Sequence, residues 1–302
     1  MKKYCLDLVV KEITKINEKY VLVKLTTPQP NATGAECVNS SASAYNIKGV
    51  NSSAVSPDGV NACAVGNEGV NALPEMLPGQ FVEVRTDGGE EAVPSPLLRR
   101  PISIHYVDVE NNELWLLVAV VGTGTRQIAA LKAGDKLNCV LPLGNGFTMP
   151  TRQGEKILLV GGGVGVAPLL YAGKKIKDMG GEPTFLLGAR SAKDLLEIDL
   201  FKAVGRVFVT TEDGTEGEKG FVTNHSLLSS ENFDRISVCG PLPMMKAVAA
   251  YAKSADTDCE VSLENKMACG LGACLCCVED TKDGNICVCK EGPVINIERL
   301  NW

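Results

Sequence analysis

Residues 267–277 read Met-Ala-Cys-Gly-Leu-Gly-Ala-Cys-Leu-Cys-Cys, and they decide how the end of the chain must fold. Cys269, Cys274 and Cys277 give the spacing C-x4-C-x2-C, and Cys289 follows as a single further cysteine. This pattern is typical of the ligands of a [2Fe-2S] cluster. The small residues between the cysteines suit a loop whose backbone N–H groups approach inorganic sulfide. The sequence therefore predicts an electron carrier with these four cysteines as metal ligands.

A zinc site, or a set of buried free thiols, is the alternative for this segment. Structural zinc sites normally combine two C-x2-C pairs, whereas only one such pair is present here. The choice of the fourth ligand stays open on spacing alone, because Cys287 lies two residues before Cys289. If residues 286–290 are extended, both thiols point to the same side of the strand. We expect the two remaining cysteines, Cys276 and Cys287, to be ordinary buried thiols.

The composition indicates a protein of a reducing compartment. The chain has 302 residues and twelve cysteines, and it contains no apolar span of about 20 residues that could cross a membrane. Its N-terminal apolar run is interrupted by Asp7 and Lys11, so we expect no signal peptide. Cysteines without an export signal favour metal ligation over a disulfide framework. A net charge of −6 argues against nucleic-acid binding. We therefore expect a cytoplasmic protein with neither a nucleic-acid partner nor a membrane anchor.

Short β-strands separated by turn residues occupy the first half of the chain, in residues 4–27 and 79–142. Many short strands of this kind predict a β-barrel. The clearest candidates are Tyr20–Leu25, Gln80–Val84, Ile102–Tyr106 and Leu114–Ala119.

A stretch rich in Ser, Asn, Gly, Ala and Val separates these two β regions, between Pro28 and Pro78. Gly-Val-Asn recurs in it at Gly49, Gly59 and Gly69. Three copies are the minimum for a small solenoid, but they carry almost no large apolar residues to bury against one another. We expect an expanded surface loop instead. Its two cysteines match no ligand spacing.

From Lys156 onward, strands alternate with helices. Residues 157–160 are an apolar strand that leads into a glycine loop and a helix ending near Asp178. Such alternation predicts a doubly wound, parallel sheet. Further apolar strands are expected at Thr184–Leu187, Val207–Thr210 and Ile236–Val238.

The glycine loop, residues 161–168, reads Gly-Gly-Gly-Val-Gly-Val-Ala-Pro between the first of these strands and its helix. At this position backbone N–H groups and the helix dipole can hold a pyrophosphate. The loop nevertheless departs from G-x-G-x-x-G, because Val166 or Pro168 stands at the third glycine position. The next strand ends in Gly-Ala-Arg at Arg190 rather than in an acidic residue. The loop alone therefore leaves open whether it binds a dinucleotide or is a tight packing corner.

Three motifs occur in an order that resembles the ferredoxin-reductase superfamily: Arg100-Pro101-Ile102-Ser103, Gly163-x-Gly165-x-x-Pro168 and Cys239-Gly240-Pro241. With the cysteine segment, the chain resembles the electron-transfer subunits of NAD-dependent, type B dihydroorotate dehydrogenases. The short gap from Cys277 to Cys289, followed by Gly292-Pro293, is the most specific element, since plant-type ferredoxins place their last cysteine much further on. Other matching stretches are Pro78–Phe81, Leu98–Ser103, Pro142–Phe147, Met267–Gly270 and Val288–Val294.

The resemblance implies three domains: a six-stranded Greek-key FAD barrel over residues 1–154 with an insertion at about 28–76, a doubly wound parallel-sheet NAD domain over 155–258, and a small [2Fe-2S] domain over 259–302. It implies that an Arg-x-x-Ser segment binds FAD, one per chain, and that Gly163, Gly165 and Cys239 lie at the NAD site. The family's Leu-Tyr-Arg flavin segment falls on Val118-Ala119-Val120, which leaves mainly backbone contacts there. The implied flavin-binding residues are Arg100, Pro101, Ile102, Ser103, Val118, Ala119, Val120, Gly124 and Thr125.

The resemblance also implies a division of labour. NAD exchanges two electrons and a [2Fe-2S] cluster passes one, and a flavin can exchange with both. A separate catalytic subunit with flavin mononucleotide would oxidise dihydroorotate, in a complex of two copies of each chain. The two histidines, His105 and His225, have no partner nearby in sequence, and we expect both to be structural.

Two alternatives remain at this stage. A subunit of a sulfide dehydrogenase or of a ferredoxin:NADP oxidoreductase complex would carry nearly the same motifs. A zinc-stabilised nucleotide-binding regulator would be colourless, whereas an iron–sulfur flavoprotein would be brown.

Overall fold

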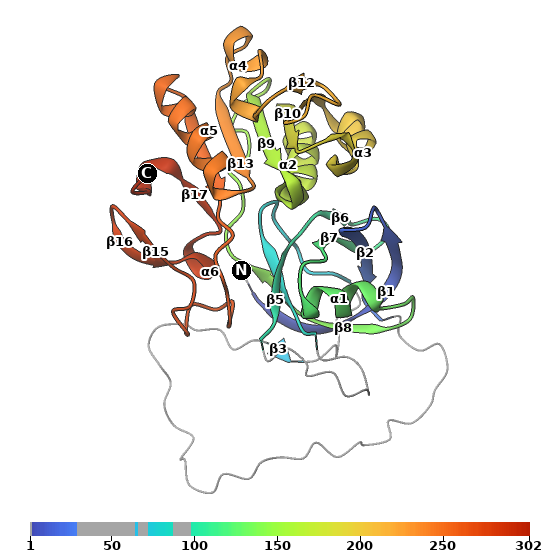
Figure 1. Ribbon diagram of the computed structural model, residues 1–302. Helices are drawn as coiled ribbons and strands as arrows, with labels where there is room; N and C mark the ends of the chain where they lie inside the picture. Colours follow the sequence, from blue (N-terminus) through green and yellow to red (C-terminus); the bar gives the residue numbers. More distant parts are fainter. Residues whose placement is uncertain (1, 29–63, 66–71, 87–97) are drawn as a thin grey trace, which may run out of the picture.

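The computed structural model describes residues 2–28, 64–65, 72–86 and 98–302. In Figure 1 a β-barrel at the N-terminal end lies beneath an α/β domain, and the cysteine segment lies beside both. The Gly-Val-Asn repeats and two cysteines of the predicted loop, Cys37 and Cys63, lie outside the described residues.

The barrel sheet has the strand order β5-β4-β8-β1-β2-β7-β6, with antiparallel pairing along this path. A two-residue strand, β3 (Ala64–Val65), pairs in parallel with the start of β1. The other strands are β1 (Tyr4–Lys15), β2 (Tyr20–Thr26), β4 (Phe81–Val84), β5 (Arg100–Ser103), β6 (Tyr106–Asp108), β7 (Glu113–Ala119) and β8 (Lys136–Leu143).

The two ends of this sheet are consecutive in the chain, and this closes the barrel. The Ile104 N–H donates to the Gln80 carbonyl beside β4, whereas the His105 N–H donates to the Trp115 carbonyl of β7. The predicted strand Ile102–Tyr106 therefore changes partners midway. Counting β5 and β6 as one interrupted strand gives the six strands predicted for the barrel, with β3 as an addition at the edge.

The barrel core consists of inward-facing Leu, Val and Ile side chains from β1, β2, β4, β7 and β8. It reaches into the region predicted as an insertion, because Met76 is almost fully buried in it and Leu73 packs against it. The Met76 carbonyl also accepts a hydrogen bond from the Tyr171 hydroxyl of the α/β domain. Residues 73–76 are therefore part of the barrel, not of a surface loop. A short helix, α1 (Thr123–Ala130), follows β7.

The second sheet has the strand order β12-β11-β10-β9-β13-β14-β17. All its pairs are parallel except β14 with β17, so the predicted doubly wound sheet is confirmed. The strands are β9 (Lys156–Gly162), β10 (Glu182–Ala189), β11 (Arg206–Thr211), β12 (Glu218–Lys219), β13 (Arg235–Cys239), β14 (Asp258–Ser262) and β17 (Val294–Asn296). The α-helices are α2 (Ala167–Asp178), α3 (Ile198–Val204), α4 (Leu227–Ser230) and α5 (Leu242–Ser254).

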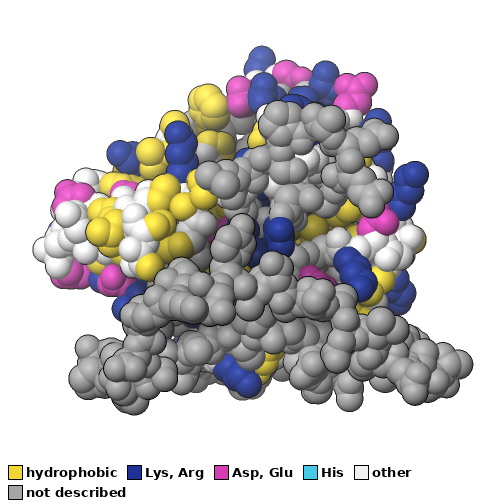
Figure 2. All heavy atoms as spheres, turned by 90° about the horizontal axis from the view of Figure 1, so that it is seen from below, with side chains coloured by type: hydrophobic (Ala, Val, Ile, Leu, Met, Phe, Trp, Pro, Cys, Tyr) yellow, Lys and Arg dark blue, Asp and Glu magenta, His cyan; other side chains and the backbone are white. Residues whose placement is uncertain are grey.

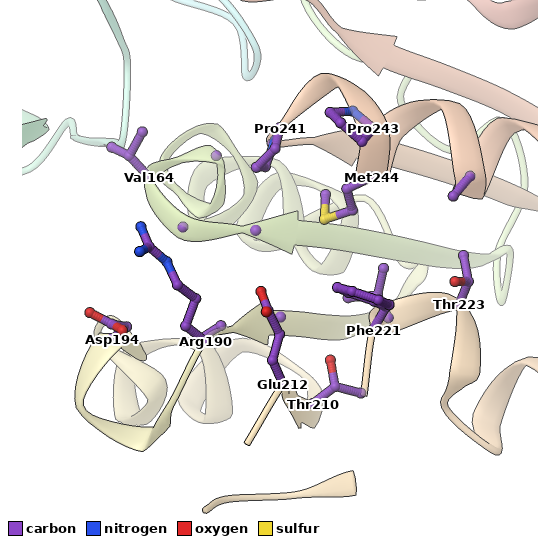
Figure 3. Close-up of a pocket in the computed structure, with 18 of the residues that line it drawn as sticks. Val164, Arg190, Asp194, Thr210, Glu212, Phe221, Thr223, Pro241, Pro243 and Met244 are labelled. Atoms are coloured by element: carbon purple, nitrogen blue, oxygen red, sulfur yellow. The ribbon is translucent and has the colours of Figure 1, made fainter. Parts of the chain in front are cut away.

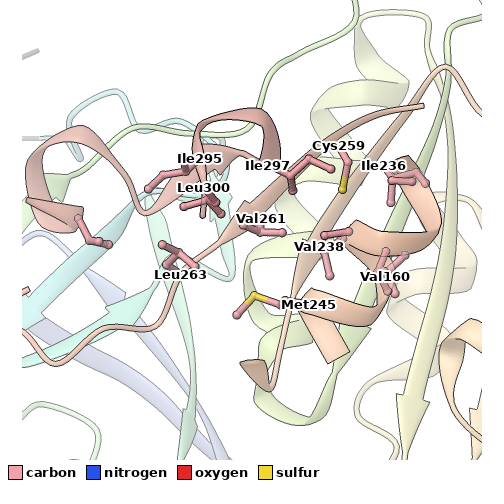
Figure 4. Close-up of a cluster of buried hydrophobic side chains, with 14 of the residues drawn as sticks. Val160, Ile236, Val238, Met245, Cys259, Val261, Leu263, Ile295, Ile297 and Leu300 are labelled. Atoms are coloured by element: carbon pink, nitrogen blue, oxygen red, sulfur yellow. The ribbon is translucent and has the colours of Figure 1, made fainter. Parts of the chain in front are cut away.

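The C-terminal segment returns to this sheet. Its own elements are the hairpin β15 (Val278–Thr281) and β16 (Gly284–Cys287) and the single turn α6 (Val288–Glu291), after which β17 pairs with β14. Ile295 and Leu300 thereby join a core with Val238, Val261 and α5 (Figure 4). The predicted domain boundary at 258/259 falls inside β14, so this sheet contains residues from both sides of it.

No helix within the described residues is long and apolar enough to cross a membrane.

Candidate functional site

A cavity of about 590 Å³ lies where β9, β10, β11 and β13 end. The chain proceeds from β9 toward β12 on one side and then crosses to β13 and β14 on the other, so β9 and β13 flank the switch point. Ligands of doubly wound sheets bind at this position. Val164, Pro241 and Met244 lie on one side of the cavity, and Arg190 and Glu212 on the other (Figure 3).

The glycine loop follows β9 as a 3-10 turn, η1 (Gly163–Val166), and lines this cavity. Gly163 has φ +58°, in the left-handed region that favours glycine. A Cβ at Gly165 would lie 2.5 Å from the Cys239 carbonyl oxygen, so only glycine permits this approach to the end of β13. Although it departs from G-x-G-x-x-G, the loop therefore lines the cavity at the switch point.

Cys239, predicted at the NAD site, is fully buried behind this loop, and Gly240 lines the cavity instead. Burial raises the pKa of the Cys239 thiol well above its usual range, so it is uncharged at neutral pH. Its Sγ lies 3.9 Å from the Oε1 of Glu264. The Glu264 carboxyl group, and not the Cys239 thiol, therefore lines the cavity.

Charged side chains at the far end of the cavity were not predicted from sequence. Glu212 follows β11, one strand later than the position at which an acidic residue was sought. Arg190 follows β10, and Lys19 reaches in from the barrel to Asp194. Partial burial opposes ionisation of Asp194, but the Lys19 ammonium, 3.1 Å from Oδ1, lowers the pKa of that carboxyl. The sequence feature that could have predicted this group is the cluster of charged residues directly after two apolar strands.

A second cavity, of about 280 Å³, lies between the barrel, the glycine loop and the start of the cysteine segment. Val164 and Glu264 line both cavities, so the two adjoin. Met267, two residues before the first predicted metal ligand, also lines it. Six of the nine residues that the resemblance implies for FAD border this space: Arg100, Pro101, Ile102, Ser103, Ala119 and Thr125.

Polar groups suited to a phosphate converge beside Arg100. Its Nη1 donates to the Leu98 carbonyl at 2.7 Å and to the Arg99 carbonyl at 3.1 Å, which orients the guanidinium. A Cβ on Gly124 would lie 3.0 Å from Arg100 Nε and 3.3 Å from Thr86 Oγ1. That hydroxyl is buried and, among the described residues, has no hydrogen-bond partner. An unpaired buried hydroxyl, a guanidinium and a helix N-terminus together fit the diphosphate of a flavin nucleotide.

The other three predicted flavin residues, Val118, Val120 and Gly124, do not line this cavity. Val118 is buried in the barrel core, and Val120 packs against it. Thr125 Oγ1 accepts the N–H groups of Val121 and Gly122 at 2.9 and 3.0 Å, so it fastens the turn that begins α1. Its hydroxyl is therefore engaged within its own helix.

Glu264 stands at the junction of the two cavities, just after β14. Burial of its carboxyl among protein atoms raises the pKa of the group, and the Cys239 thiol opposes this shift. Glu264 was not predicted, since nothing in the sequence distinguishes it from the other acidic residues near the cysteine segment.

The cysteine loop directs backbone N–H groups at sulfur. The Leu271 N–H donates to Cys269 Sγ at 3.3 Å, and the Gly272 N–H donates to Cys289 Sγ at 3.1 Å. The Cys289 N–H in turn donates to Cys277 Sγ at 3.3 Å. Burial opposes ionisation of Cys269, but its hydrogen bonds, first from Leu271 and then from Cys274, lower the pKa of that thiol to about 6. These are the contacts by which a loop stabilises cluster-bound thiolates.

The four predicted ligands lie in two contacting pairs, Cys269 with Cys274 and Cys277 with Cys289. Within the described part of the chain, no group of three or more His, Cys, Asp or Glu side chains is arranged to hold a single metal ion. The expectation for Cys276 was wrong, because this thiol is exposed.

Cys287 and Cys289 differ in their surroundings. Residues 286–290 are not extended throughout, because β16 ends at Cys287 and the turn α6 begins at Val288. Cys289 is buried and accepts an N–H group, whereas the Cys287 thiol is half-buried and donates to the Gly272 carbonyl at 3.8 Å.

Two family models match parts of this chain. The model of the iron-sulfur cluster binding domain of dihydroorotate dehydrogenase B matches residues 264–301, and that of the oxidoreductase NAD-binding domain matches residues 159–250. A solved structure of an NADH-dependent reduced ferredoxin-NADP oxidoreductase, from work on flavin-based electron bifurcation, is similar with a TM-score of 0.73 and 26% identity. That similarity covers 98% of this chain and 90% of the other.

Two curated relatives are more similar in sequence. The electron transfer subunit of dihydroorotate dehydrogenase B (NAD(+)) from Shouchella clausii is 39% identical over 225 residues, which cover 73% of this chain and 85% of that protein. The same subunit from Fusobacterium nucleatum is 41% identical over 224 residues, with 72% and 84% covered. This chain therefore belongs to the family of electron-transfer subunits of NAD(+)-dependent dihydroorotate dehydrogenase B.

Proposed function

We propose that this chain carries electrons between NAD and a catalytic dihydroorotate dehydrogenase subunit, through one FAD and one [2Fe-2S] cluster. The partner would hold flavin mononucleotide and oxidise dihydroorotate in pyrimidine biosynthesis, in a complex of two copies of each chain. The names of the relatives support the partner's activity. A cytoplasmic location belongs to the same proposal, since the ten described cysteines are all free thiols.

One observation carries the proposal: the 280 Å³ cavity borders all three parts of the chain. Arg100 and Ser103 come from the barrel, Val164 from the dinucleotide loop and Met267 from the cysteine segment. A flavin held there would adjoin the NAD cavity on one side and the cysteine loop on the other. Adjacent sites suit hydride exchange at one face and single-electron exchange at another.

The protein groups have distinct tasks in this arrangement. FAD, when bound, supplies the exchange between two-electron and one-electron chemistry. Arg100 and the N-terminus of α1 would hold its diphosphate, with Thr86 offering a hydroxyl. The Gly163–Val166 turn would hold the NAD pyrophosphate, and the Glu264 carboxyl would face the space between the two bound groups.

The assignment of the cluster ligands is also part of the proposal. We assign Cys269, Cys274, Cys277 and Cys289, because three of these sulfurs accept backbone N–H groups: Cys269 and Cys289 from the cysteine loop, and Cys277 from Cys289 itself. Cys287 donates to a carbonyl instead, as a neutral thiol does. The family-model match over residues 264–301 supports iron–sulfur over zinc.

Assays of the chain alone and of the chain with the catalytic subunit test this proposal. With its cofactors, the purified chain should pass electrons from NADH to an artificial acceptor but should not oxidise dihydroorotate. Adding the catalytic subunit should couple dihydroorotate oxidation to NAD+ reduction. Orotate formation by the chain alone, followed by its absorbance in a preparation free of the partner, would contradict the proposal. So would a colourless protein without iron, which would favour a zinc-stabilised regulator.

Removing the proposed contact between Arg100 and FAD gives an independent test of the flavin site. Arg100→Ala should weaken FAD binding by about 10- to 100-fold, because a hydrogen bond to a charged group contributes roughly 1.5–3 kcal/mol. The matched control is Arg206→Ala, which removes a guanidinium paired with Glu231 on the surface of the α/β domain. FAD affinity, measured by titrating the deflavinated proteins, should change only in the first variant.

A further inference from the structure

His105 lies at the boundary between the barrel and the α/β domain and is fully buried. It occupies the break between β5 and β6, two residues after the segment that borders the flavin cavity. In Figure 1 this break faces the α2 end of the α/β domain. The sequence predicted only a structural histidine here, and the reaction described above makes no use of it.

Both ring nitrogens of His105 face oxygen atoms of the α/β domain. Nδ1 lies 2.7 Å from the carbonyl oxygen of Ala167, and Nε2 lies 2.9 Å from Oε2 of Glu197. Ala167 directly follows the glycine turn η1 and itself borders the flavin cavity. One imidazole thus ties the flavin-bearing strand to the dinucleotide loop and to the start of α3.

The oxygen atoms that face the two ring nitrogens of His105 limit its possible protonation states. A carbonyl oxygen only accepts, so Nδ1 must carry a hydrogen. At Nε2 the proton can lie on the ring or on the Glu197 carboxyl group, because each atom can hold it. Both atoms are buried, lie 2.9 Å apart and have no other hydrogen-bond partner among the described residues, so a proton between them would satisfy both. With that proton on the ring, His105 is an imidazolium that faces a carboxylate.

The backbone conformation of Glu197 indicates that the surrounding structure holds its contact with His105 in place. Its φ of +51° lies in the left-handed region, which is uncommon for a residue other than Gly, Asn or Asp. Such conformations persist when the surroundings hold them, and they gather at functional sites. Its side chain is only 7% exposed and points to His105 Nε2.

We propose that His105 is a positioning residue of the electron-transfer reaction, held as an imidazolium by Ala167 and Glu197. It fixes the dinucleotide loop relative to the strand that carries Arg100–Ser103. A displacement of about 1 Å between reacting groups can slow a reaction by up to 10²-fold, so this contact matters for the rate. The positioning role rests on the proposed function, whereas the protonation state does not.

The chain supplies its own control for the protonation state, because it contains two histidines. His225 Nδ1 accepts the Leu227 N–H at 3.0 Å and lies farther, 3.6 Å, from Glu218 Oε1, so we expect the hydrogen of that ring on Nε2. In ¹⁵N-histidine-labelled holoprotein at pH 7, NMR should show two directly bonded ring N–H groups for His105 and one for His225. His225→Gln assigns the signals. A single ring N–H on His105 would overturn the proposal.

Two substitutions at Glu197 separate the carboxylate from the backbone. Glu197→Gly accepts the positive φ but removes the carboxylate, whereas Glu197→Gln keeps a hydrogen bond by donating its amide to a neutral His105. We expect Glu197→Gly to lower the rate of flavin reduction at saturating NADH about tenfold with unchanged FAD content, equal to about 1.4 kcal/mol. Glu197→Gln should recover most of that rate and show one ring N–H on His105.

A rate at saturating NADH equal to that of the wild type in Glu197→Gly would overturn the positioning role, as would Glu197→Gln being no faster than Glu197→Gly. A structural role alone would lower the thermal midpoint of both variants without separating their rates. If the wild-type chain does not oxidise NADH at all, the proposed function fails, and the NMR experiment still decides the protonation state of His105.

Discussion

Two neighbouring thiols at the end of the chain differ in the partners that the backbone gives them. Cys289 accepts the Gly272 N–H, and Cys287 donates to the Gly272 carbonyl. Cys289→Ser should therefore abolish the visible absorption of the cluster, while Cys287→Ser, its matched control, should keep most of it. Iron and sulfide analysis of both purified variants measures this directly. The reverse pattern would show that Cys287 is the fourth ligand.

Glu83 is a buried carboxyl group without a described partner. It lies on β4, is 0% exposed, and has no hydrogen bond to either oxygen among the described residues. Burial raises the pKa of this carboxyl from 4.5 to about 7, although Arg99 opposes the shift. Below pH 7 the folded protein therefore holds a proton that the unfolded chain has already released at pH values above 4.5.

The sign of the pH dependence follows from this difference. Since the folded state binds more protons between about pH 4.5 and pH 7, the free energy of unfolding falls as pH rises through that window. At pH 8 the ionised group costs about 3 kcal/mol, at about 1.4 kcal/mol per pKa unit. Glu83→Gln should raise the thermal midpoint by about 5 °C at pH 8 and by clearly less at pH 5. An equal effect at both pH values would mean that the carboxyl is not held protonated.

At the scale of single residues, sequence predicts groups whose proposed role depends on local spacing. The four cysteines and the Arg100–Ser103 segment are of this kind. Glu264 and the pair of His105 with Glu197 are not, because their partners are more than 20 residues distant in the chain. Nothing local distinguishes them from solvent-exposed or structural residues.

At the scale of elements, the position of the glycine loop depends on one close contact, between Gly165 and the end of β13. A Cβ at Gly165 would lie 2.5 Å from both the Cys239 carbonyl oxygen and Gly240 Cα, which are backbone atoms that cannot rotate away. Gly165→Ala should therefore push the turn off β13 and weaken NAD+ binding by about tenfold or more, which corresponds to about 1.4 kcal/mol. The control is Gly122→Ala, where a Cβ would meet no atom within 4 Å. Calorimetric titration of both variants with NAD+ tests this, and equal affinities would contradict it.

Element boundaries show where sequence patterns fail. The strand predicted at Ile102–Tyr106 is divided between two partners, because closure of the barrel requires the chain to cross from β4 to β7. Alternation would place Cys287 and Cys289 on one side only if residues 286–290 were extended, but a helical turn begins at Val288, directly after the hairpin. Both departures arise from tertiary closure, which overrides the local preference for an extended strand.

At the scale of the whole molecule, the order of the motifs predicted the three-part architecture well. The motifs did not predict that segments of one domain complete the sheet or core of another. β17, near the end of the chain, completes the NAD-domain sheet by pairing with β14, and Met76 from the predicted insertion enters the barrel core. Contacts between segments so distant in sequence leave no periodic pattern to detect.

Hydrophobic side chains around the cysteine loop remain exposed. Leu275 is 64% exposed, and Leu271 and Val278 are also exposed beside Cys274. Figure 2 shows hydrophobic side chains gathered on the side of the molecule where this segment lies in Figure 1. Under the proposed function, the catalytic subunit would cover this exposed apolar patch beside the cysteine loop.

Leu275→Asn tests this docking face without adding backbone strain. Leu275 has φ +57°, a conformation that asparagine tolerates better than leucine, so the variant should fold and bind its cluster normally. We expect it to weaken association with the catalytic subunit about tenfold and to slow dihydroorotate-dependent NAD+ reduction at limiting partner concentration. NADH oxidation with an artificial acceptor should not change, because Leu275 borders neither cavity. The control is Val109→Asn, at a position 75% exposed just after β6, which should leave both reactions unaltered. Unchanged affinity in Leu275→Asn, measured by titrating the two purified subunits, would place the partner on another face of the molecule.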